Sequence, residues 1–222
     1  SSVNPDGLTE AAVAILVYPK QDGLTIILNK RTDRVEHHKG EISFPGGGRD
    51  PEDVSILDTA LRETQEEMGI DPDDIEIIVQ LDQVSTRSGF SITPFVGVIP
   101  PDYDFKVSKI EIAEVLEVPI ESLIDTENRV EDDRVWGNEV SNKQYSYIYG
   151  THIIWGATAR IITQLLDILK KNIIIVGTDD IVHTIDSELD YIIIEEYKDT
   201  YVAIISENND FIHDLLIESD SK

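Results

Sequence analysis

Three glutamates in one short segment are the residues of this chain best suited to chemistry. Glu63, Glu66 and Glu67 stand at positions i, i+3 and i+4, a spacing that places them on one face of a helix. Carboxylates this close repel one another, and Arg62 alone among the adjacent residues can neutralise them. Hard oxygen ligands on a rigid helix suit Mg²⁺ or Mn²⁺. The triplet therefore predicts a metal site, with a solvated acidic surface as the alternative.

The helix that carries the triplet is expected to run from Asp53 to Met68. Gly69 follows it and is suited to a left-handed C-cap. Apolar positions recur along the helix at spacings of three, four and seven residues, as one buried face requires; they are Val54, Leu57, Leu61 and Met68. A glycine-rich turn, Gly46–Gly48, lies upstream and can approach a phosphate or a metal closely.

The helix and its flanks resemble the Nudix box, G-x5-E-x7-R-E-U-x-E-E-x-G-U, in which U is aliphatic. Residues 62–70 match the second half, except that Thr64 replaces the aliphatic residue. The resemblance implies that Glu63, Glu66 and Glu67 are metal ligands, helped by a carbonyl group of the glycine turn, for which Gly47 is the candidate. It also implies that Arg62 orients the glutamates by ion pairing.

The first half of the box can be aligned in two ways. Strict spacing from Arg62 places Gly48 at the glycine and Val54 at the glutamate. Alternatively, Gly46 and Glu52 keep the G-x5-E spacing, and the segment that follows is then two residues too long. The same lengthening is familiar from the coenzyme A branch of the family. The sequence leaves the roles of Glu52 and Asp53 open.

The segment before the box is similar to the signature of coenzyme A pyrophosphatases, L-L-T-x-R-S-x3-R-x3-4-G-x3-F-P-G-G. Arg31, Gly40 and residues 44–47 fall in register, whereas Asn29 replaces Thr and Glu36 occupies the second Arg position. A basic loop suits coenzyme A, because its 3′-phosphate adds charge for Arg or Lys to bind. The residues that the resemblance assigns to substrate binding are Arg31, Arg34, Lys39, Phe44, Gly46 and Gly47.

A further acidic residue is expected near the strand that ends at Val118-Pro119. Many Nudix enzymes place a metal ligand or a base there, and Glu114 is the candidate, with Glu111 behind it. The general base is left open between Glu66, Glu67, Glu114 and a loop residue. Trp155 and Thr158 are expected to serve in packing.

The order of the predicted elements indicates an α/β/α sandwich with a mixed β-sheet between helices. Residues 1–171 are expected to form this domain, and residues 172–222 an α/β extension of unknown role. Before residue 172 the first two predicted strands, Ala11–Tyr18 and Leu24–Leu28, form a hairpin. The other strands are Ile42–Phe44, Ile75–Leu81, Ile92–Ile99, Val115–Val118 and Gln144–Tyr149, with a second helix at Trp155–Lys170. In the extension they are Ile173–Val176, Tyr191–Ile194 and Tyr201–Ile205, followed by a helical stretch at Phe211–Ile217.

The composition of the chain restricts the kinds of molecule that it can bind. The formal net charge is −26, from 44 acidic and 18 basic residues, so the surface repels the backbone of DNA or RNA. No apolar run reaches the roughly 20 residues that a membrane helix needs. The chain has no cysteine, which excludes disulfides and thiol chemistry. We expect a cytoplasmic protein with a small nucleotide substrate, and the resemblance is compatible with a homodimer.

The expected reaction is metal-assisted attack of water on a phosphorus of a pyrophosphate. Coenzyme A or its thioesters are the first candidates, with 3′,5′-ADP and 4′-phosphopantetheine as the products of coenzyme A. The nearest alternative is a Nudix pyrophosphatase of other or broad specificity, acting on ADP-ribose, dinucleotides or nucleoside triphosphates. A third hypothesis is a non-catalytic domain that senses a nucleotide. It is disfavoured because such domains usually lose box glutamates, whereas this chain keeps all three.

Overall fold

The computed structural model describes residues 3–4, 7–20, 23–32, 40–132, 144–178, 191–197 and 200–206. The chain divides into two compact units, Ser1–Gln164 and Leu165–Lys222. The division falls within helix α3 (Gly156–Lys171), ahead of the domain boundary that the sequence predicts at residue 171.

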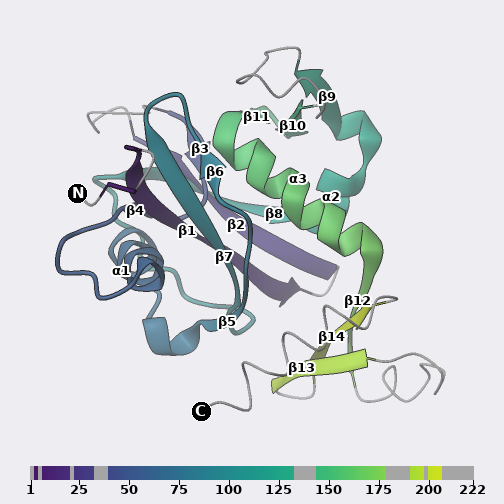
Figure 1. The fold of residues 1–222 in the computed structure, drawn as a ribbon. Helices are drawn as coiled ribbons and strands as arrows, with labels where there is room; N and C mark the ends of the chain where they lie inside the picture. The colour runs from purple at the N-terminus through teal and green to yellow at the C-terminus, as the bar shows by residue number, and fades with distance from the viewer. Residues whose placement is uncertain are drawn as a thin grey trace. The chain divides into compact units, whose positions relative to one another are not determined.

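A mixed β-sheet forms the centre of the first unit (Figure 1). Strands β1 (Thr9–Lys20) and β2 (Gly23–Arg31) form the predicted antiparallel hairpin. On its other side β1 runs parallel to β7 (Phe90–Val98). The remaining strands of this sheet are β3 (Ile42–Ser43), β4 (Gly46–Gly48), β5 (Glu76–Gln80), β6 (Val84–Ser85) and β8 (Ile112–Pro119).

Helix α1 (Ile56–Met68) carries the glutamate triplet and begins later than predicted. Its N-cap is Ser55, whose Oγ accepts from the Asp58 N–H at 3.1 Å, while the Asp58 carboxylate accepts from the Ser55 N–H at 2.7 Å. This capping box fixes the start, so the predicted start at Asp53 is wrong. Val54 is 91% exposed and does not belong to the apolar face. Gly69 ends the helix in the predicted left-handed conformation, with φ of 67°.

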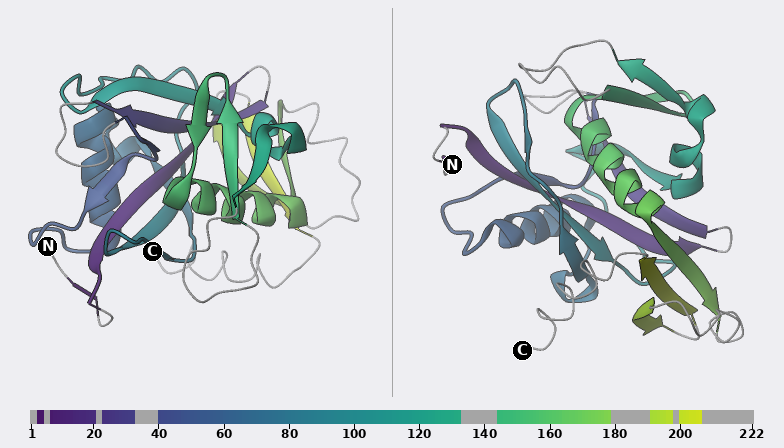
Figure 2. Two further views of the ribbon diagram at one scale, coloured as in Figure 1. Left: turned by 90° about the horizontal axis from the view of Figure 1, so that it is seen from above. Right: turned by 45° about the vertical axis from the view of Figure 1, so that its right-hand side comes forward.

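The two long helices lie on opposite sides of the sheet, which confirms the predicted sandwich (Figure 1, Figure 2). Met68 of α1 is buried in a core with Leu16 and Ile27 of the β1–β2 hairpin. Thr64 is fully buried, which explains why the family prefers an aliphatic residue at this position. On the other side, the Thr158 hydroxyl donates to the Ile42 carbonyl at 3.0 Å and fastens the start of α3 to β3.

Short elements complete the first unit. A second sheet holds β9 (Arg129–Asp132), β10 (Gln144–Tyr149) and β11 (His152–Ile154), of which only β10 was predicted. The other short elements are α2 (Ile120–Ile124) and the 3₁₀ turns η1 (Pro72–Asp74) and η2 (Thr126–Asn128). Segments this short carry too few residues for a periodic pattern.

The second unit contains an antiparallel sheet in the order β12-β14-β13. Its strands are β12 (Asn172–Thr178), β13 (Tyr191–Tyr197) and β14 (Thr200–Ser206), one for each apolar run of the sequence. The predicted helical stretch at residues 211–217 lies outside the described residues. Throughout the described part of the chain, no helix is both long and apolar enough to span a membrane.

Candidate active site

Glu67, in the last turn of α1, is the most enclosed of the three glutamates. Its side chain is 2% exposed and accepts three hydrogen bonds. Asn29 Nδ2 donates at 3.0 Å, the Arg31 guanidinium at 3.2 Å and the Gly46 N–H at 3.2 Å. Burial raises the pKa of Glu67 to about 7, although Arg31, Gly46 and Asn29 all oppose the rise. The carboxyl group is therefore firmly positioned but poorly stabilised in its charged form.

Strand geometry explains how these donors converge. Asn29 and Arg31 are two residues apart on β2, so their side chains leave the same face of the sheet. Gly46 lies on β4 opposite Val13 of β1, which brings its N–H to the same region. Gly46 has φ of 150°, and a Cβ there would collide with the Ala12 carbonyl oxygen. The position therefore requires glycine.

Glu63 lies one turn earlier, against the glycine turn. A Cβ on Gly47 would come within 2.5 Å of the Glu63 carboxyl carbon, so the missing side chain makes room for this carboxylate. Arg62 Nη1 donates to Glu63 at 2.8 Å and lies 3.5 Å from both carboxylate oxygens of Glu66. Burial raises the pKa of Glu63, Arg62 opposes that rise, and the charges of Glu66 and Glu111 add to it.

Asp53 answers the question that the two alignments of the box leave open. Its carboxylate, 4% exposed, accepts from Arg62 Nε at 2.8 Å and Nη2 at 3.1 Å, and from the Thr59 hydroxyl at 2.8 Å. The Arg62 guanidinium holds the pKa of Asp53 well below its usual range. Asp53, rather than Glu52 or Val54, is therefore the acidic partner that anchors Arg62 beside Glu63.

The three glutamates form a series from buried to open: Glu67 is 2% exposed, Glu63 19% and Glu66 57%. Among the described residues, no three His, Asp or Glu side chains lie close enough together to form a complete metal site. Each glutamate of the triplet has a basic partner instead, Arg31 or Arg62. The donor set nevertheless fits a hard divalent cation, because all three side chains are carboxylates and burial disfavours the negative charge on Glu63 and Glu67.

The two candidate carboxylates near β8 differ in their surroundings. Glu114 lies 3.4 Å from His152 Nε2 and 3.7 Å from Lys30 Nζ, and neither partner belongs to α1. Glu111 acts electrostatically on Glu63. Its carbonyl accepts from the Thr32 N–H at 2.7 Å, and Ser108 in the same loop donates its N–H to the Glu67 carbonyl at 2.9 Å. The structure therefore favours Glu111 over Glu114 as the additional acidic group near the triplet.

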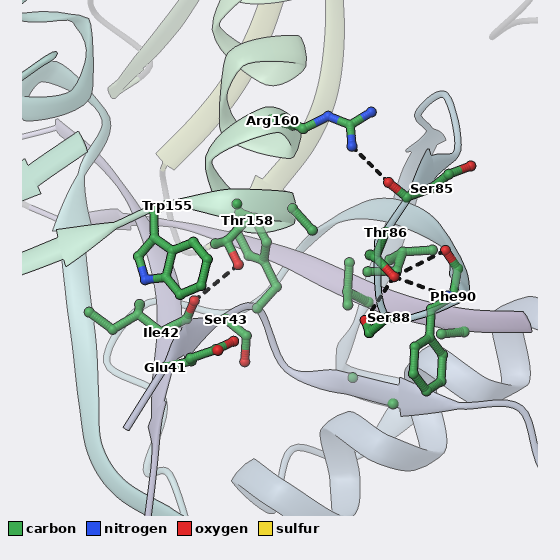
Figure 3. Close-up of a pocket in the computed structure, with 18 of the residues that line it drawn as sticks. Glu41, Ile42, Ser43, Ser85, Thr86, Ser88, Phe90, Trp155, Thr158 and Arg160 are labelled. Carbon is green, nitrogen blue, oxygen red and sulfur yellow. Dashed lines mark hydrogen bonds between the residues drawn. The ribbon is translucent and has the colours of Figure 1, made fainter. Parts of the chain in front are cut away.

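A cavity of about 440 Å³ lies beside the glycine turn (Figure 3). Gly46–Gly48 and Arg31 contribute to its wall, which joins it to the surroundings of Glu67. Trp155, Glu41 and Ser43 lie on one side, and Phe90 with Thr86 and Ser88 on the other. The volume falls in the usual range for small-molecule sites.

The structure brings together most of the predicted substrate residues. Arg31, Phe44, Gly46 and Gly47 all line the cavity, although Phe44 is only 1% exposed. Arg31 also pairs with Glu67, a contact that the sequence did not predict. Arg34 and Lys39 lie outside the described residues, as does Glu36.

Sequence reasoning missed several residues of the site. Asn29 was noted only as a departure from the signature, yet a polar residue at the end of the apolar run Ile26–Leu28 was a usable signal. Trp155 was assigned to packing, but it lines the cavity and is 37% exposed. Arg160 lines the same cavity and donates to the Ser85 carbonyl at 2.7 Å. The two residues are far apart in the sequence, so no local pattern predicts this contact.

A mixed sheet between helices, with a strip of glutamates beside a nucleotide-sized cavity, defines the class of a pyrophosphohydrolase. The NUDIX domain model matches residues 8–135, and the chain belongs to the Nudix hydrolase family. The family generally uses divalent cations such as Mg²⁺ or Mn²⁺ and acts on small nucleotide substrates.

The chain is similar to curated proteins called uncharacterized Nudix hydrolase NudL. It is 39% identical to the protein of Enterobacter sp. (strain 638) over 165 residues, covering 70% of this chain and 80% of the relative. It is 36% identical to the protein of Escherichia coli (strain SMS-3-5 / SECEC) over 157 residues, with the same two shares covered.

Solved structures with partial similarity include two Nudix proteins. A MutT/nudix family protein from Enterococcus faecalis is 13% identical, with a TM-score of 0.47, covering 77% of this chain and 66% of that protein. The NUDIX domain of Shewanella oneidensis NrtR, solved with ADP ribose, is 19% identical, with a TM-score of 0.42, covering 55% of this chain and 80% of that domain.

Proposed function

We propose that this Nudix hydrolase cleaves the pyrophosphate bond of coenzyme A or its thioesters, releasing 3′,5′-ADP from each. The observation that carries the proposal is the single continuous site formed by the coenzyme A signature and the glutamate helix. Arg31 belongs to the signature, pairs with Glu67 at 3.2 Å and lines the cavity. Gly46 and Gly47 belong to it as well, and they lie against Glu67 and Glu63.

This proposal gives each residue of the site a role. Glu63, Glu66 and Glu67 would hold the cation, and Gly47 leaves room for the Glu63 carboxylate. Arg62 fixes the glutamates through its pairing with Asp53 and Glu63. Arg31, Phe44 and the glycine turn bind substrate, together with Arg34 and Lys39 of the basic loop. The cation, Mg²⁺ or Mn²⁺, would supply neutralisation of phosphoryl charge and a lowered pKa for water.

Proton removal from the attacking water is assigned to Glu67. Its carboxyl group is the most firmly positioned of the triplet, because Asn29, Arg31 and Gly46 all donate to it. Glu66 is more exposed and less fixed, and Glu114 pairs with Lys30 and His152.

A second candidate is a Nudix pyrophosphatase with another or a broader substrate range. Glu36 at the second Arg position of the signature favours it, because a carboxylate there weakens the binding of a 3′-phosphate. ADP-ribose and NADH share the adenosine diphosphate half of coenzyme A without that phosphate.

Product analysis distinguishes the two. The protein is incubated with coenzyme A, dephospho-coenzyme A, ADP-ribose and NADH in Mg²⁺ or Mn²⁺, and the products are separated. Fastest cleavage of coenzyme A to 3′,5′-ADP and 4′-phosphopantetheine supports the first candidate. Equal turnover of coenzyme A and dephospho-coenzyme A would show that the basic loop does not recognise the 3′-phosphate. Faster cleavage of ADP-ribose or NADH supports the second candidate.

A further inference from the structure

We propose that Trp155 stacks on the purine base of the substrate, so that the cavity beside the glycine turn is a base-binding pocket rather than a site for the pantetheine arm. The proposal deepens the proposed function, on which it rests for the position of the pyrophosphate beside α1. It assigns a specificity role to a residue outside both the Nudix box and the coenzyme A signature.

Trp155 is unusual among its neighbours. It stands between β11 and α3, next to Ile154, which is fully buried, yet its own side chain is 37% exposed and lines the cavity. The backbone around it is well anchored, since β11 pairs with β10 and the nearby Thr158 bonds the Ile42 carbonyl. A large aromatic side chain on a fixed support, open to a cavity, is suited to stacking on a flat ring.

Other residues of the cavity also suit a base. Ser43 lies near Trp155 (Figure 3), and its hydroxyl group can accept a hydrogen bond from an amino group such as the exocyclic amine of adenine. Phe90 closes the opposite side, so both sides present an aromatic residue.

Arg31 joins the cavity to the glutamate helix, because it lines the cavity and contacts Glu67. A nucleotide whose pyrophosphate lies beside α1 can therefore place its base in the cavity. A nucleoside is rigid and flat at its base, whereas pantetheine is a flexible chain without a ring. Stacking therefore gives Trp155 a means of discriminating between the two halves of coenzyme A.

Intrinsic fluorescence tests the proposal on the intact protein without metal or turnover. Adenosine and pantetheine are both uncharged probes, so repulsion by the glutamates does not affect the comparison. We expect adenosine, and not pantetheine, to quench the tryptophan emission in a saturable way. The sequence has two tryptophans, and in Trp155→Phe the remaining one is Trp136, so quenching that this variant loses belongs to Trp155.

Kinetics give a second, independent measurement. Trp155→Ala is expected to raise KM for the cleaved substrate by about tenfold with kcat nearly unchanged, and Trp155→Phe to recover most of that loss. Ile153→Ala is the matched control, because Ile153 is an apolar residue of β11 that is 59% exposed and absent from the cavity wall. It should leave KM unchanged.

Quenching by pantetheine instead of adenosine, or quenching by neither probe, overturns the proposal. So does a fall in kcat without a change in KM for Trp155→Ala. These outcomes are separable from a failure of the proposed function: if coenzyme A is not cleaved but adenosine still quenches Trp155, the base pocket stands and only the substrate changes.

Discussion

Two buried carboxylates at opposite ends of the glutamate helix differ in whether their surroundings stabilise the negative charge. Asp53, before the helix, is 4% exposed and Glu67, in its last turn, is 2% exposed. Arg62 pairs with Asp53 through two nitrogens and lowers its pKa, whereas burial raises the pKa of Glu67 to about 7 despite three donors. Asp53 therefore stabilises the fold with its charge, whereas a charge on Glu67 costs stability.

The largest expected effect is that of Glu67→Gln. We expect turnover to fall by about a thousandfold, because the variant loses a cation ligand and the proposed base. The free energy of unfolding should stay equal or rise, because a charge that burial disfavours is removed. Steady-state kinetics and urea unfolding measure the two effects. A pure binding domain would have no turnover to lose, and a clear loss of stability would contradict the contrast with Asp53.

Asp53→Asn should show the opposite pattern. We expect the free energy of unfolding to fall by about 2 kcal/mol, because Arg62 loses a buried ionic partner. Turnover should fall by about tenfold, since Arg62 is then less well fixed beside Glu63. Glu52→Gln is the matched control, because Glu52 is an exposed acidic neighbour that makes no ion pair with Arg62. Equal effects of the two substitutions would show that Asp53 has no special role.

The pH dependence of stability sharpens the same contrast. The folded-state pKa of Asp53 lies below its ordinary value of 3.8. The stabilisation by Asp53 is therefore complete above the unfolded-state pKa and is lost as the pH falls through that value toward the folded-state pKa. We expect the stability difference between the wild type and Asp53→Asn to be constant from about pH 7 to pH 5 and to shrink below about pH 4. Urea unfolding of both proteins across this range measures it.

Asn29→Ala tests how far Glu67 depends on its positioning. Asn29 is fully buried and its amide donates to Glu67 at 3.0 Å, so its loss should leave the carboxyl group less fixed. We expect kcat to fall by about tenfold with KM nearly unchanged. Asn29→Gln, which keeps the donor on a longer side chain, should recover part of the activity. Equal losses in both variants, together with lower thermal stability, would indicate a packing role instead.

The sequence predicted those features that depend on local spacing. The alignment of Glu63, Glu66 and Glu67, the Gly69 cap and the β1–β2 hairpin follow from residues close in the chain, and the structure has all of them. It could not predict contacts made across elements, such as Asn29 with Glu67 or Arg160 with Ser85. The Asp53 pairing escaped prediction for a related reason. The turn at residues 49–55 decides which acidic side chain reaches Arg62, and spacing alone does not determine the path of a turn.

The smallest expected effects separate the two acidic residues near β8. Glu111 acts on Glu63, whereas Glu114 pairs with Lys30 and His152. We therefore expect Glu111→Gln to lower turnover several-fold and Glu114→Gln to change it by less than about twofold, since exposed ion pairs contribute little. Steady-state kinetics at several Mg²⁺ concentrations measure both. The reverse order would restore Glu114 as the additional ligand or base, because cation binding would then have to draw its side chain away from His152 and toward α1.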